Sequence, residues 1–133
     1  MRDLIKIFKA LSDETRLRIL NLMIERDCCV CEVMQTLEIS QTRASRNLSQ
    51  LYDAGLLEQR REGLWTIYYL SPRVTADYRN LIVNSVENAL NQDDRATADR
   101  LLLQKSNRLC PVTEVKGGIN GSPKGIRCVS PVK

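Results

Sequence analysis

The chain has 133 residues and contains no histidine. This absence excludes Ser-His-Asp and Cys-His nucleophilic sites, mixed Cys/His zinc sites and any proton transfer by an imidazole. Aromatic residues make up only 5% of the chain. No apolar run approaches the roughly 18 residues of a membrane span, and the charged N-terminal residues leave no room for a secretory apolar core. We therefore expect a cytoplasmic protein that makes no membrane contact.

The five cysteines are unevenly placed. Cys28, Cys29 and Cys31 occupy four consecutive positions, whereas Cys110 and Cys128 lie far downstream. An odd number in this spacing is a poor disulfide framework. With no export signal, we expect cytosolic thiols that are available to soft metal ions or to redox chemistry.

Charge and composition divide the chain into two parts. Residues 1–90 hold twelve basic and twelve acidic side chains, whereas residues 91–133 hold eight basic and four acidic ones. An anion bound by the first part must therefore meet a local face, because bulk charge offers no attraction. After Asn107 come three of the four prolines and four of the six glycines. We expect a folded unit over residues 1–91 and, over 92–133, a partly helical and then irregular, mobile tail.

Apolar residues at helical spacing predict four helices before residue 55. Ser12 and Ser40 are the expected N-caps of the second and fourth helices, and Gly55 is the expected end of the fourth. The third helical pattern contains the cysteine cluster. The apolar positions that define the four patterns are Leu4, Ile5, Phe8 and Leu11; Leu17, Leu20 and Ile24; Val30, Val33, Met34 and Leu37; and Ala44, Leu48 and Leu51.

The pattern then changes to extended runs at residues 56–61 and 64–70, separated by Glu62-Gly63. This arrangement predicts a β-hairpin. Beyond it, a long apolar stripe at helical spacing runs from Tyr78 to Leu90, and residues 94–105 could prolong or restart a helix. A small domain has difficulty burying so long a stripe by itself, so we expect it to pair with a second copy of the chain.

The third and fourth helices are joined by Glu38-Ile39-Ser40, which is typical of a helix-turn-helix whose second helix enters the major groove of DNA. Arg can read guanine, Gln and Asn can read adenine, and Ser or Thr suits phosphates or base edges. The positions expected to face outward and contact DNA are Gln41, Thr42, Arg43, Ser45, Arg46 and Asn47.

A solvated polar helix face would have the same composition, but the hairpin that follows favours DNA contact. Arg60 and Arg61 precede its turn and would project beside the groove as a wing that meets phosphates. The expected fold is mainly α with a β-hairpin (α+β): a dimeric winged helix-turn-helix with an irregular C-terminal tail.

Four separated motifs resemble the ArsR/SmtB family of metalloregulatory repressors, in the same order and over about residues 3–90. They are residues 8–20 (FKALSDETRLRIL), 29–33 (CVCEV), 40–48 (SQTRASRNL) and 55–57 (GLL). The resemblance implies a homodimer that occupies double-stranded operator DNA and leaves when a metal or metalloid binds. It also implies that Cys29 and Cys31 hold arsenite or antimonite, or in relatives cadmium, lead or zinc. We expect a regulator with no catalytic cofactor and no enzymatic activity.

Thiolates without imidazole favour thiophilic ions, and As(III) needs only three sulfurs. In an unbroken helix Cys28 and Cys31 would share a face, but Cys29 and Cys31 would point about 200° apart. Binding by both therefore requires that the first turn be unwound, or that it unwind on binding. A ligand that prefers such a conformer would shift the population away from the DNA-competent one.

The third ligand is left open by the motif. Relatives that respond to arsenic often have a third cysteine where this chain has Met34. Cys28 is the obvious substitute, and Cys110 or Cys128, from the same or the partner chain, are the alternatives. The expected inducer is As(III) or Sb(III), with Cd(II) or Pb(II) as alternatives.

Three rival interpretations remain. The thiols could sense oxidation, although only Arg26 is close enough in sequence to activate a thiolate. The Cys-x-x-Cys spacing of Cys28 and Cys31 could indicate a dithiol oxidoreductase, although such a motif normally follows a strand and here follows a helix. A winged helix that binds only proteins would show no salt-dependent affinity for DNA.

Overall fold

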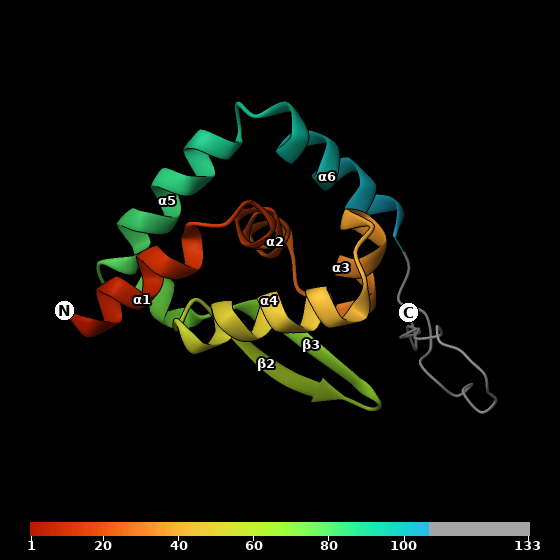
Figure 1. Ribbon diagram of the computed structural model, residues 1–133, viewed down its shortest axis with the longest axis horizontal. Coiled ribbons are helices and arrows are strands. Elements are labelled where there is room, and N and C mark those ends of the chain that lie inside the picture. Colours follow the sequence, from red (N-terminus) through yellow and green to blue (C-terminus); the bar gives the residue numbers. More distant parts are fainter. Residues whose placement is uncertain (107–133) are drawn as a thin grey trace.

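The computed structural model describes residues 1–106 and confirms a mostly helical fold with a small antiparallel sheet (Figure 1). The irregular tail expected after Asn107 lies outside these residues. In chain order the elements are α1 (Arg2–Leu11), α2 (Glu14–Glu25), β1 (Cys28–Cys29), α3 (Val30–Leu37), α4 (Gln41–Asp53), β2 (Leu57–Glu62), β3 (Trp65–Leu70), the 3-10 helix η1 (Pro72–Thr75), α5 (Arg79–Leu90) and α6 (Asp94–Lys105).

Short polar side chains set the helix ends. Ser40 caps α4 as expected, because its Oγ accepts a hydrogen bond of 3.1 Å from the Arg43 amide. The expectation for Ser12 is wrong: Asp13 caps α2, accepting from the Arg16 amide at 3.0 Å. Ser12 instead ends α1, and its Oγ donates to the Lys9 carbonyl at 2.8 Å. Both residue types can cap a helix, but an N-cap residue has an extended backbone, and here that residue is Asp13.

The hairpin forms where the sequence predicts it, and it gains a third strand. The strand order is β1-β3-β2, and both pairings are antiparallel. Gly63, with φ of +64°, makes the turn. The added strand is β1, in which Cys28 pairs with Tyr68 and Cys29 with Ile67. The third helix therefore begins at Val30, after the first two cysteines, and not before them.

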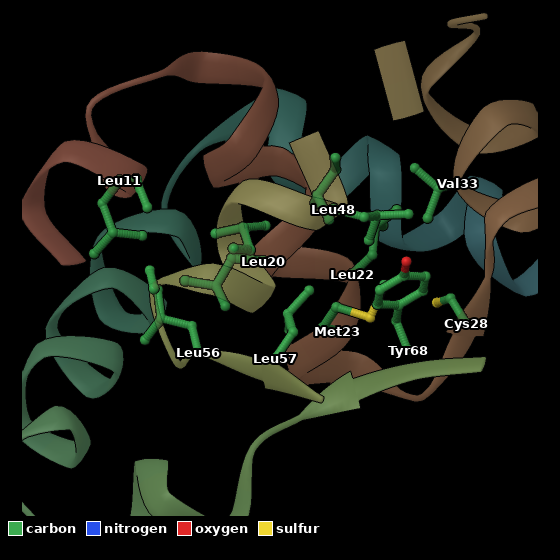
Figure 2. Close-up of a cluster of buried hydrophobic side chains, with 14 of the residues drawn as sticks. Leu11, Leu20, Leu22, Met23, Cys28, Val33, Leu48, Leu56, Leu57 and Tyr68 are labelled. Carbon is green, nitrogen blue, oxygen red and sulfur yellow. The ribbon is translucent and has the colours of Figure 1, made fainter. Parts of the chain in front are cut away.

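The core is built around α2, which lies at the centre of the molecule in Figure 1, with α5 and α6 arching over one side and the hairpin on the other. The close-up in Figure 2 shows α2, α4 and the strands meeting there. The largest fully buried side chains are Ile7, Ile19, Leu20, Leu22, Val33, Leu48, Leu51, Leu56, Leu57, Ile67, Val74 and Leu103.

Helix α6 restarts after a turn and packs against α2 and α3. Asp93 caps it by accepting from the Ala96 amide at 3.0 Å. Arg18 of α2 donates two hydrogen bonds, of 2.8 and 2.9 Å, to the carboxylate of the buried Asp99, and this contact raises the pKa of Arg18. Part of the segment expected to form a separate tail thus packs against the core of residues 1–91.

Within residues 1–106, none of the helices combines the length and the apolar character that crossing a membrane requires.

Two neighbouring leucines of α6 test whether this helix belongs to the cooperative fold. Leu103 is fully buried, whereas Leu102 is 45% exposed. We expect Leu103→Ala to lower the free energy of unfolding in urea by about 2–5 kcal/mol, because it leaves a cavity in the core. The matched control Leu102→Ala should change it by less than about 0.5 kcal/mol. Equal effects of the two substitutions would contradict the docking of α6.

Candidate DNA-reading surface and thiol site

Helices α3 and α4 form the expected helix-turn-helix. The turn between them is tight: Glu38 has a left-handed backbone with φ of 57°, and the Ile39 amide donates to the Met34 carbonyl at 3.3 Å. Ser40 then starts α4. This short link fixes the direction in which α4 leaves α3 and so fixes which of its side chains face outward.

Most of the predicted groove-reading residues lie on the outer face of α4. Gln41, Thr42, Arg43 and Arg46 are exposed, and Ser45 is half-buried. Arg43 also donates from Nη2 to the Thr15 Oγ1 at 2.9 Å, which holds its side chain near the start of α2. The face opposite the buried Ala44, Leu48 and Leu51 is thus rich in hydrogen-bond donors.

Asn47 is an exception, and the expectation that it faces outward is wrong. It is only 9% exposed. Its Nδ2 donates to the Arg43 carbonyl at 2.8 Å, and its Oδ1 accepts from the Arg16 Nη1 at 3.2 Å. Asn47 lies at the edge of the apolar stripe, one residue before Leu48, and is turned inward by its partner on α2.

The two arginines of the wing differ. Both are exposed on β2, and Arg61 makes no ion pair within residues 1–106. Arg60 bonds to Asp27 at 2.9 Å and to Glu62 at 2.7 Å, and these two hydrogen bonds raise its pKa. Because Asp27 immediately precedes the cysteine cluster, Arg60 joins the wing to the strand that carries the thiols.

The two cysteines of the Cys-Val-Cys motif converge. Cys29 precedes α3 in an extended conformation, with φ of −92° and ψ of 169°, and Cys31 lies in the first helical turn. Their Sγ atoms are 2.8 Å apart, and both side chains are buried. The divergence of about 200° calculated for an unbroken helix does not apply, because Cys29 lies outside the helix.

The thiol pair packs directly against the wing. Cys29 and Cys31 form a buried cluster with Trp65 and Ile67 of β3, separate from the main core. Trp65 is the only tryptophan in the chain. The backbone pairing of Cys29 with Ile67 adds a second link. A displacement of the two sulfurs would therefore reach the wing strand without an intermediate element.

Cys28 faces the other way. Successive side chains of a strand alternate between its faces, and Cys28 points into the main core near Tyr68 and Met23 (Figure 2). Burial in this core also raises the pKa of Tyr68. Residues 1–106 contain no group of three or more Cys, His, Asp or Glu side chains placed to hold a metal ion. The structure thus brings Cys29 and Cys31 together without Cys28, and Cys110 and Cys128 lie outside the described residues.

Comparison with known proteins identifies the family. The model of the bacterial regulatory proteins of the arsR family matches residues 13–59. An arsenic resistance transcriptional regulator of Pseudomonas putida is 49% identical over 70 residues, covering 51% of this chain and 54% of that protein. The arsenical resistance operon repressor of Escherichia coli is 45% identical over 73 residues, covering 54% and 62%. An HTH-type transcriptional regulator of Methanocaldococcus jannaschii is 42% identical over 66 residues, covering 49% and 74%. The chain belongs to the ArsR family.

Solved structures agree on the fold. HlyU of Vibrio cholerae superposes with a TM-score of 0.58 at 28% identity, over 68% of this chain and 95% of that one. A homodimeric winged helix-turn-helix domain of Mycobacterium bovis gives 0.59 at 27% identity, over 70% and 82%. These results confirm the family and the winged helix that the motifs predict. The relatives are named as transcriptional regulators or repressors, which agrees with the expectation that the chain is not an enzyme. The chain spans 54% of the Pseudomonas putida protein and 62% of the Escherichia coli protein.

A group of polar contacts made by Glu32 at the thiol site of this ArsR-family chain, here called the Glu32 clasp, is not predicted by the sequence. The Cys29 amide donates to Glu32 Oε1 at 2.9 Å, and Arg26 Nη1 donates to Glu32 Oε2 at 2.8 Å. Arg26 Nη2 also donates to the Leu103 carbonyl at 3.1 Å, near the end of α6. A helix-starting residue followed three positions later by Glu is the sequence signal of a capping box, but Cys29 in place of Ser or Thr concealed it.

The apolar stripe expected to pair with a second copy is only partly on the surface, because Ile82 and Val86 of α5 pack against the core. On α5, Leu81 is 70% exposed, and on α1, Ile5 and Phe8 are 48% and 55% exposed. Both helices bury their other faces in the core, through Ile7 and Val83 among others. These are apolar side chains of α1 and α5 that the rest of residues 1–106 leaves uncovered.

The Glu32 clasp predicts a stability effect. We expect Glu32→Ala to lower the free energy of unfolding by about 1–3 kcal/mol, because the Cys29 amide loses its buried acceptor. The control Glu25→Ala, on the exposed end of α2, should change it by less than about 0.5 kcal/mol. Thermal unfolding followed by circular dichroism measures both. A Glu32→Ala protein as stable as the control would show that the clasp does not hold Cys29.

Proposed function

We propose that this chain is an operator-binding repressor that acts as a homodimer and leaves DNA when arsenite or antimonite binds Cys29 and Cys31. The observation that carries the proposal is the convergence of the two sulfurs, 2.8 Å apart, where a strand paired with the wing meets the first turn of α3. The names of the two relatives from Pseudomonas putida and Escherichia coli support an arsenic-related inducer.

On the DNA side, the outer face of α4 reads the major groove. Arg43 and Arg46 have the donor geometry for guanine, and Gln41 suits adenine, while Thr42 and Ser45 suit phosphates or base edges. Arg61 of the wing meets backbone phosphate, which attracts DNA of any sequence. Asn47 and Arg60 hold α4 and the wing in place through their bonds to Arg16 and Asp27.

The dimer forms through the apolar surfaces of α1 and α5. Burial of Phe8 and Leu81 against a second copy would remove a large apolar area from water, which is the main driving force of association. The Mycobacterium bovis domain is described as homodimeric, which supports a homodimer for this chain. A symmetric dimer reads an inverted repeat whose half-sites are about 34–36 Å apart.

On the inducer side, thiolates select soft ions, and the converging pair supplies two sulfur ligands for As(III) or Sb(III), with Cd(II) or Pb(II) as alternatives. The third donor is Cys28, which would have to turn out of the core, or one of Cys110 and Cys128. When bound, the ion draws Cys29 and Cys31 into its own coordination geometry. Because β1 pairs with β3 and Asp27 holds Arg60, this change reaches the wing.

The short sulfur distance also favours a second candidate, in which the thiols respond to oxidation. A peroxide would accept two electrons and two protons from the thiols, forming a Cys29–Cys31 disulfide and releasing two molecules of water, or one of water and one of an alcohol. The same strand would be distorted, so the two candidates differ in the effector and share the path to DNA.

Titration of a protein–operator complex separates these candidates. We expect arsenite to release DNA from the wild type, lowering its affinity by about 5- to 150-fold, the usual range of couplings between sites. Cys29→Ser and Cys31→Ser should stay bound, because each removes one of the two sulfur ligands. A retained response in Cys28→Ser, with loss in Cys110→Ser or Cys128→Ser, would identify the third donor. Release by peroxide while arsenite has no effect would support the redox alternative instead.

Two arginines test the DNA-reading surface. Arg46→Ala should weaken operator binding by about 1–3 kcal/mol and relax sequence preference, because it removes a base contact. Arg61→Ala should weaken binding to all sequences about equally, because it removes a phosphate contact. The slope of log affinity against log salt concentration should fall in magnitude by about one. Arg95→Ala, on the exposed face of α6, is the control. Unchanged binding in both test variants would show that DNA meets another face.

A further inference from the structure

Arg16 lies where three helices meet. It is in the first turn of α2, and its guanidinium reaches back to the end of α1, where Nε donates to the Ala10 carbonyl at 2.7 Å and Nη2 to the Lys9 carbonyl at 3.3 Å. A cation at a helix C-terminus is stabilised by the helix dipole. Its third donor, Nη1, contacts the Asn47 Oδ1 of α4 at 3.2 Å.

Asn47 belongs to α4, the helix proposed to read DNA, and connects Arg16 to the backbone of that helix. The side chain is buried, and its Nδ2 donates to the Arg43 carbonyl, one turn earlier in α4. Arg43 returns to α2 through its bond to Thr15. The N-terminal half of α4 is therefore held against the start of α2 at two points, and one of them is the guanidinium that also holds α1.

The other face of α1 carries Ile5 and Phe8, which are exposed and belong to the proposed dimer surface. Arg16 is thus a direct link between the helix that would contact the second copy and the helix that would read DNA. A change in the angle between α1 and α4 would occur in both copies of the dimer, and it would change the distance between their two α4 helices. Successive base pairs are about 3.4 Å apart, so a small rotation changes which spacing of half-sites the dimer matches.

We propose that Arg16 is a positioning residue that, with Asn47, sets the spacing of operator half-sites that the dimer reads. The inference rests on the proposed function, since it requires a DNA-binding dimer. Arginine suits this role because its planar fork holds three acceptors in fixed directions, whereas the single ammonium of lysine does not.

The test uses the full-length protein and the inverted repeat that the wild type selects from random DNA. Its affinity is measured for that duplex, for duplexes with one or two base pairs added or removed between the half-sites, and for a single half-site. The wild type should prefer one spacing sharply. Arg16→Lys and Asn47→Ala should lose about fivefold or more of the spacing preference, a larger change than either shows in its affinity for a single half-site. The control Arg95→Lys should match the wild type.

A merely structural role for Arg16 predicts a different result, in which the variants lose folded protein and bind every duplex less while keeping the spacing preference. That result, or an unchanged profile in both variants, would overturn the inference. If Arg16→Lys does not fold, Asn47→Ala decides, because it leaves the bonds of Arg16 to α1 intact. If the wild type itself selects no DNA, the proposed function fails and the inference fails with it.

Discussion

The arrangement depends on one short backbone pairing, in which the two residues of β1 bond to β3. This pairing keeps Cys28 and Cys29 extended and forces α3 to begin at Val30. Strand alternation then sends Cys28 into the main core and Cys29 toward Cys31, Trp65 and Ile67. Because the wing lies on one side of the thiol pair and the helix-turn-helix follows on the other, the proposed effector at these sulfurs would act on both the wing and α4.

Hydrogen bonds from arginine side chains connect the helices that surround this sheet. Arg18 holds α6 to α2 through Asp99, Arg26 joins α6 to the thiol strand through Glu32, and Arg16 joins α1 to α4. Such partly buried pairs add little net stability compared with apolar packing, but removing one partner is costly. Each of them joins two elements that are distant in sequence and so restricts the angle between them.

Periodicity predicts α2, α4 and the hairpin, and capping predicts the start of α4, because long amphipathic segments and turn residues carry strong local signals. The two-residue strand β1 is too short for any periodicity, so the helical pattern that follows it wrongly takes in Cys28 and Cys29. Asn47 looked like a DNA contact because a polar residue beside an apolar stripe usually faces water. The pairing of Arg60 with Asp27 joins residues 33 positions apart, and no local pattern predicts it. In α6, Leu101, Leu102 and Leu103 are equivalent in type, and only tertiary packing selects Leu103 for the core.

The proposed switch requires an ion bound to the thiol pair and the operator to favour different conformations of one sheet. Trp65 emission measures this most directly, because the only tryptophan of the chain packs against the two cysteines. Arsenite is titrated into the free protein and into the operator complex, with emission as the readout of binding. Reciprocity requires operator DNA to weaken arsenite binding by the same factor by which arsenite weakens operator binding. An arsenite affinity that is equal with and without operator DNA would contradict the account.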